Sequence, residues 1–516
     1  MQPLCKCLVL LIFVVYLLIL CELLTWSPQN ILGEHGGGDY LYFKKYDKPS
    51  SVDINLDKVK IHSKSFIHVT EVDGPNIREP GDTNVNKFDI KQSPVTYRKK
   101  ETSNKWNKAI KIGELRDKNS TKLKTKGPKI KRKTDVIRSD IKIRNDWQPV
   151  DDPATLFVFS GYFDDKSKHP VIRIIGISLR NRTQPYINCR FTTNTPDGPI
   201  TYRREGYIRG LPEDKGLKYF GVFVICKIKP DDRPSTVSVS LKTQESMNKI
   251  RISYPDPPQV EFAVCFPAVT SKYNNIFELV QTVEMARILG AQKFYIYDHG
   301  APPEIRRILH LYRQQGLFEV IEWKLPVFEI HYFGQLVAVN DCLYRNVGIT
   351  KYVLFMDLDE MVIPRQHSTW LEMMKVLDKE KGGYSTFYFQ MSYFHKEWED
   401  VYDRLEQFKL NQTELVKKFR IQLLSKIWRE EQIQKVKYRS KYFVRPEKVE
   451  TLAIHVVYTY RDRSRFNAVD PKIAIVQHYR LRGNHPARVL DWSARRFTKP
   501  LINMVGETWL QLMEED

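Results

Sequence analysis

The sequence is poor in cysteine and contains none of the short motifs that identify many enzymes directly. Seven cysteines in 516 residues are too few for a disulfide-rich scaffold, and the absence of C-x-x-C spacing argues against a structural zinc site. No P-loop, no glycine-rich dinucleotide fingerprint, no H-E-x-x-H and no G-x-S-x-G occurs. The chain therefore lacks the sequence signatures of several large enzyme classes. A hydrophobic content of 42% excludes a wholly disordered chain.

Positive charge is abundant but unevenly distributed. The net charge of +21 comes from 82 Lys and Arg against 61 Asp and Glu, and alone it would favour a nucleic-acid-binding protein. Residues 98–133 contain fifteen basic and three acidic residues, a net of +12, which is more than half of the excess. This stretch has almost no apolar periodicity, and its basic residues are not interleaved with aromatics. The charge therefore indicates a tail or linker, and nucleic-acid binding is not expected.

An apolar run near the N-terminus predicts membrane insertion. Residues 7–21 carry no charge, with Lys6 before them and Trp26 shortly after. No small-residue cleavage site follows, so we expect an uncleaved transmembrane signal-anchor over residues 7–26, with residues 1–6 in the cytoplasm. A cleaved signal peptide and a buried core helix are the alternatives. The span is short, which suits the thin bilayers of the early secretory pathway.

Either form of membrane targeting places the rest of the chain in an oxidising lumen. Three N-x-[ST] acceptors for glycosylation agree with this location: Asn119, Asn181 and Asn411. The four cysteines outside the apolar region could form two disulfides in such a compartment: Cys189, Cys226, Cys265 and Cys342. Three pairings are possible, and four buried free thiols are the alternative.

Composition divides the remainder into three parts. Residues 27–146 are polar, lysine-rich and nearly without pattern, which predicts a flexible, disordered stem. Apolar runs separated by turn signals then predict a small β-rich lumenal domain over residues 147–255, with strands at 156–160, 171–177, 219–226 and 236–241. A proline cluster near residue 255 marks the boundary to the last part, residues 256–516.

The last part alternates between strand and helix patterns. Apolar strands are expected at residues 260–266, 293–297, 318–323 and 351–356. The signals that begin and end the intervening helices are Asn274 or Asn275, Gly290, Pro302–Pro303 and Gly316. Such units predict a Rossmann-like, mostly parallel α/β sheet, whose ligands bind at the carboxyl ends of the strands. A charged amphipathic helix is expected over residues 403–434.

The fourth of these strands leads directly into Asp357-Leu358-Asp359-Glu360. Alternate residues of an extended segment point to the same side, so the carboxylates of Asp357 and Asp359 are expected to face the ligand crevice together. Adjacent carboxylates repel unless a cation neutralises them, and Mn²⁺ or Mg²⁺ prefers oxygen ligands, including substrate phosphate oxygens. The motif therefore predicts a metal site for a nucleotide diphosphate; a solvated acidic turn is the alternative.

The segment Tyr352–Pro364 resembles the signature of glycosyltransferase family 92, as do Phe294–Asp298 and Gln477–Arg480. Residues 157–164 and 171–176 are similar to the leading β region of that family, so the resemblance covers about residues 150–485. It implies a GT-A fold, a single-pass type II Golgi membrane protein with a lumenal catalytic domain, and Mn²⁺. It also implies inverting transfer from a UDP-sugar, usually UDP-galactose, to give a β-linkage. Nematode members that this chain resembles galactosylate fucose on N-glycan cores.

The resemblance assigns Asp357 and Asp359 to the diphosphate–metal site, with Asp359 as the direct metal ligand. His478 resembles the distal histidine that GT-A enzymes often supply as a further ligand; a hydrogen-bonded strand residue is the alternative. Arg480 could pair with diphosphate oxygens or form a surface ion pair. Asp298 could accept a hydrogen bond from ribose or uracil, or could cap the following helix.

An inverting transfer needs a general base for the acceptor hydroxyl. Residues 393–400 place three carboxylates beside aromatic rings that could stack on a sugar, and one of the three would be the base: Glu397, Glu399 or Asp400. The segment is less glycine-rich than the family pattern, and a solvated loop is the alternative. His455 is expected in the core or behind the metal ligands.

Two other functions compete with that of an enzyme. The first is an inactive relative that binds glycans in the lumen, although the intact pair Asp357 and Asp359 argues against it. The second is a secreted protein that binds heparin-like polyanions through residues 98–133. The expected partners of the favoured enzyme are a UDP-sugar, a glycan acceptor and the membrane.

Overall fold

The computed structural model describes residues 145–514, apart from 167–168, 182–185, 214, 242–245, 258, 380–382, 404–410, 462–464 and 484–485. All of them belong to one compact unit, Lys126–Asp516. The expected anchor at residues 7–26, the acceptor Asn119 and nearly all of the expected stem lie outside the described residues. Within the part of the chain that is described, no helix is long and apolar enough to span a membrane.

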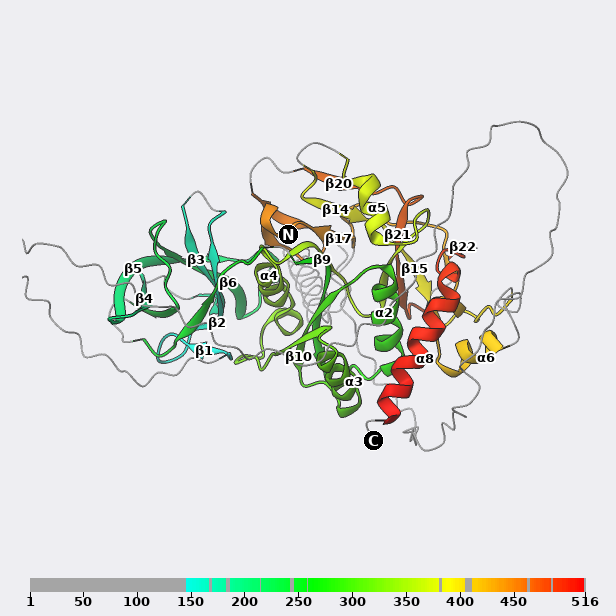
Figure 1. The fold of residues 1–516 in the computed structure, drawn as a ribbon, viewed down its shortest axis with the longest axis horizontal. Coiled ribbons are helices and arrows are strands. Elements are labelled where there is room, and N and C mark those ends of the chain that lie inside the picture. The colour runs from blue at the N-terminus through cyan, green and yellow to red at the C-terminus, as the bar shows by residue number, and fades with distance from the viewer. Residues whose placement is uncertain are drawn as a thin grey trace, which may run out of the picture. The chain divides into compact units, whose positions relative to one another are not determined.

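The first described part is a mainly antiparallel sheet that closes on itself (Figure 1). Its order is β1-β2-β3-β6-β5-β4-β7-β8, and β8 also pairs with β2. The four strands predicted from apolar runs are confirmed as β2, β3, β6 and β7. The bounds are β1 (Gln148–Pro149), β2 (Leu156–Asp164), β3 (Val171–Leu179), β4 (Ile187–Thr195), β5 (Gly198–Gly210), β6 (Tyr219–Lys227), β7 (Thr236–Leu241) and β8 (Ile250–Ser253).

The second part is built on a seven-stranded sheet with the order β11-β10-β9-β12-β17-β14-β20. The first four strands of this order are parallel, while β17 is antiparallel to both of its neighbours. The expected alternation of strands and helices is confirmed: β9 (Val260–Thr270), α2 (Ile276–Leu289), β10 (Lys293–His299), α3 (Pro303–Gln314), β11 (Phe318–Glu322), α4 (Gln335–Arg345) and β12 (Thr350–Phe355).

Local signals account for the helix bounds. The Asn275 side chain accepts a hydrogen bond from the Glu278 amide at 3.1 Å and so caps α2. Gly290 ends that helix with a φ of 117°, a left-handed conformation that costs glycine little. Pro303 occupies the first turn of α3, where its missing N–H leaves no helical hydrogen bond unmade.

Helices cover both faces of this sheet. Alternate residues of β9 enter two different cores: Phe262 and Val264 pack with α2 and α3, whereas Cys265 packs with α4. The chain order reverses between β9 and β12, because the crossover through α4 returns to the opposite side of β9. In open α/β sheets such a switch point is where ligands bind, at the carboxyl ends of the strands.

A second, three-stranded sheet, β13-β21-β15, follows β12 directly: β13 (Glu360–Pro364), β21 (Ala474–Arg480) and β15 (Met391–His395). The remaining elements are η3 (His331–Gly334), α5 (Trp370–Leu377), β14 (Thr386–Phe389), α6 (Asn411–Lys418), α7 (Gln422–Ser425), β16 (Trp428–Glu430), β17 (Lys441–Val444), η5 (Pro446–Lys448), β18 (Val449–Leu452), β19 (Val457–Tyr460), β20 (Phe466–Ala468), β22 (Arg488–Leu490), η6 (Arg495–Phe497) and α8 (Thr498–Glu514).

The single helix expected over residues 403–434 is wrong. The described part of that segment holds the two short helices α6 and α7 and the strand β16. Ile421, Leu423 and Leu424 are buried there, so tertiary packing overrides the helical charge pattern. Of the two glycosylation acceptors within the described range, Asn181 is exposed in a turn and Asn411 begins α6.

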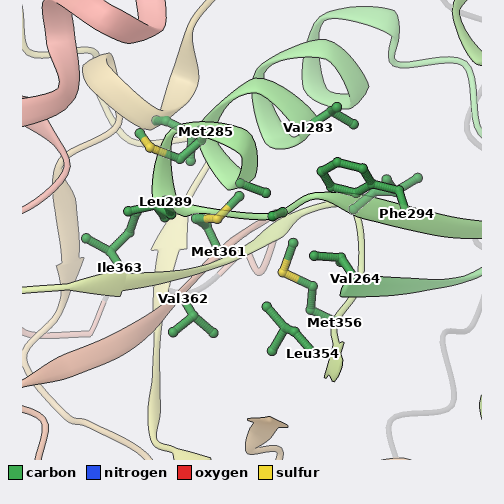
Figure 2. Packing of buried hydrophobic residues seen from close by; sticks show 14 of the residues in the cluster. Val264, Val283, Met285, Leu289, Phe294, Leu354, Met356, Met361, Val362 and Ile363 are labelled. Carbon is green, nitrogen blue, oxygen red and sulfur yellow. The ribbon is translucent and has the colours of Figure 1, made fainter. Parts of the chain in front are cut away.

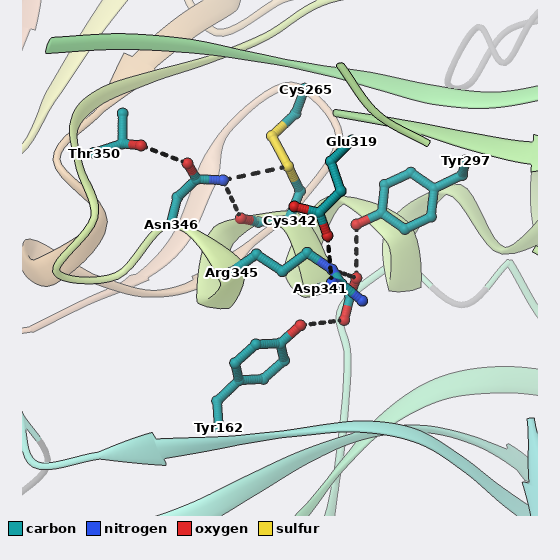
Figure 3. The surroundings of a disulfide bond; sticks show 9 residues. All are labelled: Tyr162, Cys265, Tyr297, Glu319, Asp341, Cys342, Arg345, Asn346 and Thr350. Carbon is teal, nitrogen blue, oxygen red and sulfur yellow. Dashed lines mark hydrogen bonds and ion pairs between the residues drawn. A yellow bond between two sulfur atoms is a disulfide. The ribbon is translucent and has the colours of Figure 1, made fainter. Parts of the chain in front are cut away.

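The β-rich sheet and the seven-stranded sheet are joined through α4. Asp341 of this helix is fully buried and accepts hydrogen bonds from Tyr162 of β2 at 2.7 Å and from Tyr297 of β10 at 2.8 Å (Figure 3). Arg345 donates to the same carboxylate at 2.6 Å. The β-rich sheet and the α/β sheet therefore share a polar junction as well as a hydrophobic core.

Two disulfides connect neighbouring elements. Cys265 of β9 is bonded to Cys342 of α4, as Figure 3 shows, and Cys189 of β4 is bonded to Cys226 of β6. This is one of the three pairings that the sequence permits. The first bond ties the switch-point strand to the crossover helix.

Candidate active site

The acidic motif lies between β12 and β13, at the switch point of the sheet. Leu358 and Asp359 form a turn, in which the Glu360 amide donates to the Asp357 carbonyl at 3.2 Å. Hydrophobic residues anchor both sides of this turn: Met356 and Met361 are buried in the core that α2 covers (Figure 2). Leu358 is buried in the same core. The expectation of an extended segment is therefore wrong, and Asp357 and Asp359 meet different partners.

Asp357 and Glu360 share a buried lysine that no local signal in the sequence marks. The Lys441 ammonium lies 2.8 Å from Asp357 Oδ2 and 2.9 Å from Glu360 Oε2. Its side chain is 3% exposed. Burial opposes the charge, but the two carboxylates raise the pKa of Lys441 above its usual value. Lys441 begins β17, and only the antiparallel pairing of β17 with β12 brings it to the turn.

Asp359 faces His478. Glu360 lies opposite His478 in the β13–β21 pairing, and His478 Nε2 is 3.4 Å from Asp359 Oδ2, while Nδ1 is 3.2 Å from Glu360 Oε1. Burial lowers the pKa of His478, but these carboxylates outweigh it and raise that pKa. Burial raises the pKa of Asp359, but the hydrogen bond and charge of His478 lower it overall. The structure therefore brings together the two predicted ligands Asp359 and His478.

The three predicted metal ligands, Asp357, Asp359 and His478, are only partly arranged to bind a divalent cation. Asp359 is 31% exposed and His478 12%, so an oxygen and a nitrogen donor lie next to each other near solvent. The Asp357 side chain is 35% exposed but is held by Lys441. Among the described residues, no group of three or more His, Cys, Asp or Glu side chains is arranged to hold a metal ion. Asp359 and His478 thus suit a cation that completes its shell with substrate oxygens.

Glu360 is the fully enclosed member of the cluster, with a side chain 2% exposed. Burial raises its pKa, and Lys441 works against that shift. His455 is half-buried, and the charges of Lys441 and Asp357 also influence its pKa. Burial and the charge of Lys441 lower the pKa of His455 to about 4, although Asp357 opposes them. His455 is therefore neutral at physiological pH, behind the acidic turn.

The predicted nucleotide residues Asp298 and Arg480 have local partners. Asp298 is the second-last residue of β10, at the same sheet edge, and its Oδ1 accepts from the amides of Gly300 at 2.9 Å and Ala301 at 2.7 Å. Its Oδ2 accepts from Arg306 Nε at 2.9 Å. Asp298 thus stabilises the turn before α3. Arg480 lies two residues after His478 on β21, with its guanidinium 5.4 Å from the ring centre of Tyr393.

The three candidate bases each have a basic or amide partner. Glu397 Oε1 accepts from the amides of Arg482 at 3.0 Å and Gly483 at 2.8 Å. Glu399 Oε2 accepts from Arg488 Nη1 at 2.7 Å, and Asp400 Oδ2 is 3.4 Å from Lys426 Nζ. Those backbone hydrogen bonds outweigh partial burial and lower the pKa of Glu397, and the Arg488 hydrogen bond lowers that of Glu399. The base assignment stays a prediction.

The aromatic residues around these carboxylates are buried. Tyr393, Phe394 and Trp398 are 2%, 0% and 5% exposed, and the Trp398 ring stacks on the ring of His395 at 4.0 Å. These rings therefore fill the core beneath β15 and β21 and present little surface to a sugar, contrary to expectation.

A second buried charge pair lies beside the turn and was not foreseen. Lys396 and Gln422 both donate to Glu278 of α2, the latter at 3.0 Å, and the Glu278 side chain is 5% exposed. The charge of Lys396 also helps to lower the pKa of Asp359. No local signal marks Glu278, because its role follows from the packing of α2 against the turn after β15.

Fold and site together define an α/β protein with a carboxylate–imidazole pair at the switch point of its sheet. The sequence model of glycosyltransferase family 92 matches residues 260–515, which include this sheet and the whole acidic cluster. The chain belongs to glycosyltransferase family 92 through this domain. The match begins at β9, so the β-rich part, where the sequence also suggested a resemblance, lies outside it.

Two curated relatives come from Caenorhabditis elegans. The beta-1,4-galactosyltransferase galt-1 is 26% identical over 257 residues, which cover 44% of this chain and 59% of that protein. A second glycosyltransferase family 92 protein is 23% identical over 159 residues, 28% of this chain and 31% of that protein. The chain thus aligns with less than two thirds of the length of either relative.

Solved structures also resemble parts of the chain. Staphylococcus aureus TarS in complex with UDP is 13% identical, with a TM-score of 0.25, and the match covers 48% of this chain and 65% of that one. Glucosyl-3-phosphoglycerate synthase from Mycobacterium tuberculosis, in complex with Mn²⁺, UDP and glucosyl-3-phosphoglycerate, is 14% identical with a TM-score of 0.21, over 49% and 80% of the two chains. TM-scores of this size carry no conclusion about this chain.

Proposed function

We propose that the protein is an inverting glycosyltransferase with a GT-A catalytic domain, which transfers galactose from UDP-galactose to a glycan to form a β-linkage. Membership of glycosyltransferase family 92 supports the reaction class. The name of a 26% identical relative supports galactose. The observation that carries the proposal is the Asp359–His478 pair at the switch point, 3.4 Å apart and partly exposed to solvent. Fucose of an N-glycan core is the proposed acceptor.

Asp359 and His478 would hold a divalent cation, Mn²⁺ or Mg²⁺, which when bound neutralises charge on the departing UDP. Lys441 keeps Asp357 and Glu360 in place and balances one of their two negative charges. Asp357, Asp298 and Arg480 would contact the nucleotide. His455 stays neutral behind the turn and adds no positive charge there.

The chemical step exchanges one bond to the anomeric carbon for another. The acceptor hydroxyl oxygen bonds to that carbon as the bond to the β-phosphate oxygen breaks, and UDP leaves with the electron pair. The hydroxyl proton passes to a carboxylate, for which Glu397, Glu399 and Asp400 are the candidates. Attack from the face opposite the leaving group inverts the configuration.

The test is a panel of UDP-sugars incubated with the purified full chain and a fucosylated N-glycan, with Mn²⁺ or with a chelator. We expect Mn²⁺-dependent release of UDP and transfer of galactose. Asp359→Asn should reduce turnover by at least about a hundredfold, since it removes charge at the diphosphate site. The matched control Asp256→Asn, on an exposed residue, should retain full activity. Glycan binding without turnover of any UDP-sugar would favour the inactive relative.

We also propose that the chain is a single-pass type II protein of the Golgi membrane, anchored through residues 7–26. The apolar run in the sequence supports this topology. In sealed Golgi vesicles, a tag at the N-terminus should be digested by added protease, while the C-terminus should be protected. Protection of both ends would contradict the proposal.

A further inference from the structure

A cavity of about 730 Å³ lies where the β-rich sheet meets the family 92 domain. This volume falls within the range of small-ligand sites, about 300–1,000 Å³. The cavity is separate from the acidic turn, because none of its lining residues belongs to the cluster around Asp359. Its lining includes Lys166, Arg173, Tyr207, Lys227, Lys229 and Glu450.

A buried guanidinium forms part of its wall. Arg173 is 1% exposed, and its Nε and Nη2 donate to Asp164 Oδ2 at 3.2 and 2.9 Å. The remaining nitrogen, Nη1, is buried and has no hydrogen-bond partner within the described part of the chain. An unsatisfied buried donor costs about 1–3 kcal/mol. The wall of the cavity therefore contains a fixed positive charge, while Nη1 itself is closed off from solvent.

The acidic groups near this cation are already neutralised. Arg461 Nη1 donates to Asp164 Oδ1 at 2.7 Å, so two guanidinium groups hold this one carboxylate. Glu450, the acidic residue that lines the cavity, accepts from Arg173 at 3.0 Å and from Arg209 at 2.9 Å. The three arginines around the cavity wall outnumber these two carboxylates, so the acidic groups do not cancel all of the positive charge there.

Exposed lysines extend this positive charge to the rim. Lys227 at the end of β6 and Lys229 just after it both line the cavity and are both exposed. Lys166 lines it as well and lies 3.3 Å from Asp165. Clustered charge of one sign in a concave site attracts ligands of opposite charge. An anionic group is therefore the ligand feature that the cavity suits.

Tyrosines provide the remaining recognition surface. Tyr207 on β5 is 48% exposed, and Tyr460, the last residue of β19, also lines the cavity. A tyrosine offers an apolar face and a hydroxyl, which suit the mixed polar and apolar surface of a pyranose. We propose that this cavity binds a saccharide that carries a phosphate or sulfate group, at a site distinct from the one proposed for the UDP-sugar.

The test is calorimetric titration of the full chain with glucose 6-phosphate, glucose 6-sulfate, glucose and inorganic phosphate. We expect the sugar esters to bind, with an affinity that falls as salt rises, and glucose to bind at least about tenfold more weakly. The tighter of the two esters identifies the anion. Inorganic phosphate that binds as tightly as either ester would overturn the saccharide assignment.

Matched variants locate the site. Lys227→Gln with Lys229→Gln removes two exposed rim charges and should weaken ester binding about tenfold. Lys375→Gln with Lys499→Gln removes two exposed charges that do not line the cavity and should leave binding unchanged. Tyr207→Ala should weaken the binding of sugar esters but not that of inorganic phosphate. No binding of either ester up to about 10 mM, or equal losses in both double variants, would overturn the proposal.

Discussion

Replacing Lys441 by methionine tests whether the acidic turn depends on its buried cation. Methionine preserves most of the volume of the side chain and removes the charge. The change leaves Asp357 and Glu360 without the ammonium that lies 2.8 and 2.9 Å from them. Since the Glu360 side chain is 2% exposed, water cannot replace the lost partner there.

The expected loss of stability is about 3–5 kcal/mol at pH 8, as for other buried ion pairs that lose one member. Protonation of Glu360 can relieve part of it. Its pKa is already raised in the folded state by burial, and Lys441 opposes that rise, so removal of Lys441 raises the pKa further. An acid whose folded pKa exceeds its unfolded pKa destabilises the fold increasingly as pH rises through these values. The penalty should therefore be largest at pH 8 and smaller at pH 5.

The assay is urea unfolding of the full chain at both pH values, followed by tryptophan fluorescence. Glu360→Gln added to Lys441→Met removes the second carboxylate charge and should recover much of the lost stability at pH 8. The exposed Lys472→Met serves as the matched control and should change stability by less than about 0.5 kcal/mol. A loss below about 1 kcal/mol for Lys441→Met at pH 8, or the same loss at pH 5, would refute the reasoning.

Two further predictions concern the junction between the sheets. Burial raises the pKa of Asp164, but Arg461 and Arg173 outweigh it and lower that pKa below its usual value. The stability that the ionised Asp164 contributes to the fold is therefore fully present above its unfolded pKa. It is lost as the pH falls through the folded pKa. Asp164→Asn should therefore cost about 3 kcal/mol at pH 7 and less at pH 3, as measured by urea unfolding; an equal cost at both would contradict this account. The Cys265–Cys342 bond closes a separation of 77 residues, and replacing both cysteines by serine should cost about 4 kcal/mol in thermal unfolding. In this double variant, added reductant can no longer break a bond between positions 265 and 342, so it should lower the melting temperature less than it does in the unchanged protein. An unchanged melting temperature in the variant would refute a stabilising role for the bond.

The positions of the strands and helices before the acidic turn follow from the sequence because their signals are local. An apolar run, the cap at Asn275 and the glycine at position 290 act within one or two turns of chain, and each has the expected structure. The placement of Asp357 and Asp359 at the end of β12 follows in the same way. Once the strands are parallel, the end of an apolar strand defines the ligand edge.

Local signals fail where distant segments determine the conformation. The charge periodicity of residues 403–434 suggests one helix, but burial of Ile421 and Leu424 favours two short helices and a strand. The D-x-D motif suggests an extended segment, but the hydrogen bonds of Glu360 fold it into a turn. In both cases long-range contacts contribute more free energy than the local preference.

By itself, the sequence determined the α/β class, the order of the strands and helices before the turn, and the two acids at the end of β12, because each depends on residues close together in the chain. Only the tertiary structure decided that Lys441 neutralises Asp357, that His478 faces Asp359, and that Cys265 pairs with Cys342. Only the tertiary structure also forms the basic cavity around Arg173. These contacts join segments separated by tens to hundreds of residues, and they form only when strand register and packing bring the side chains within a few ångströms of one another.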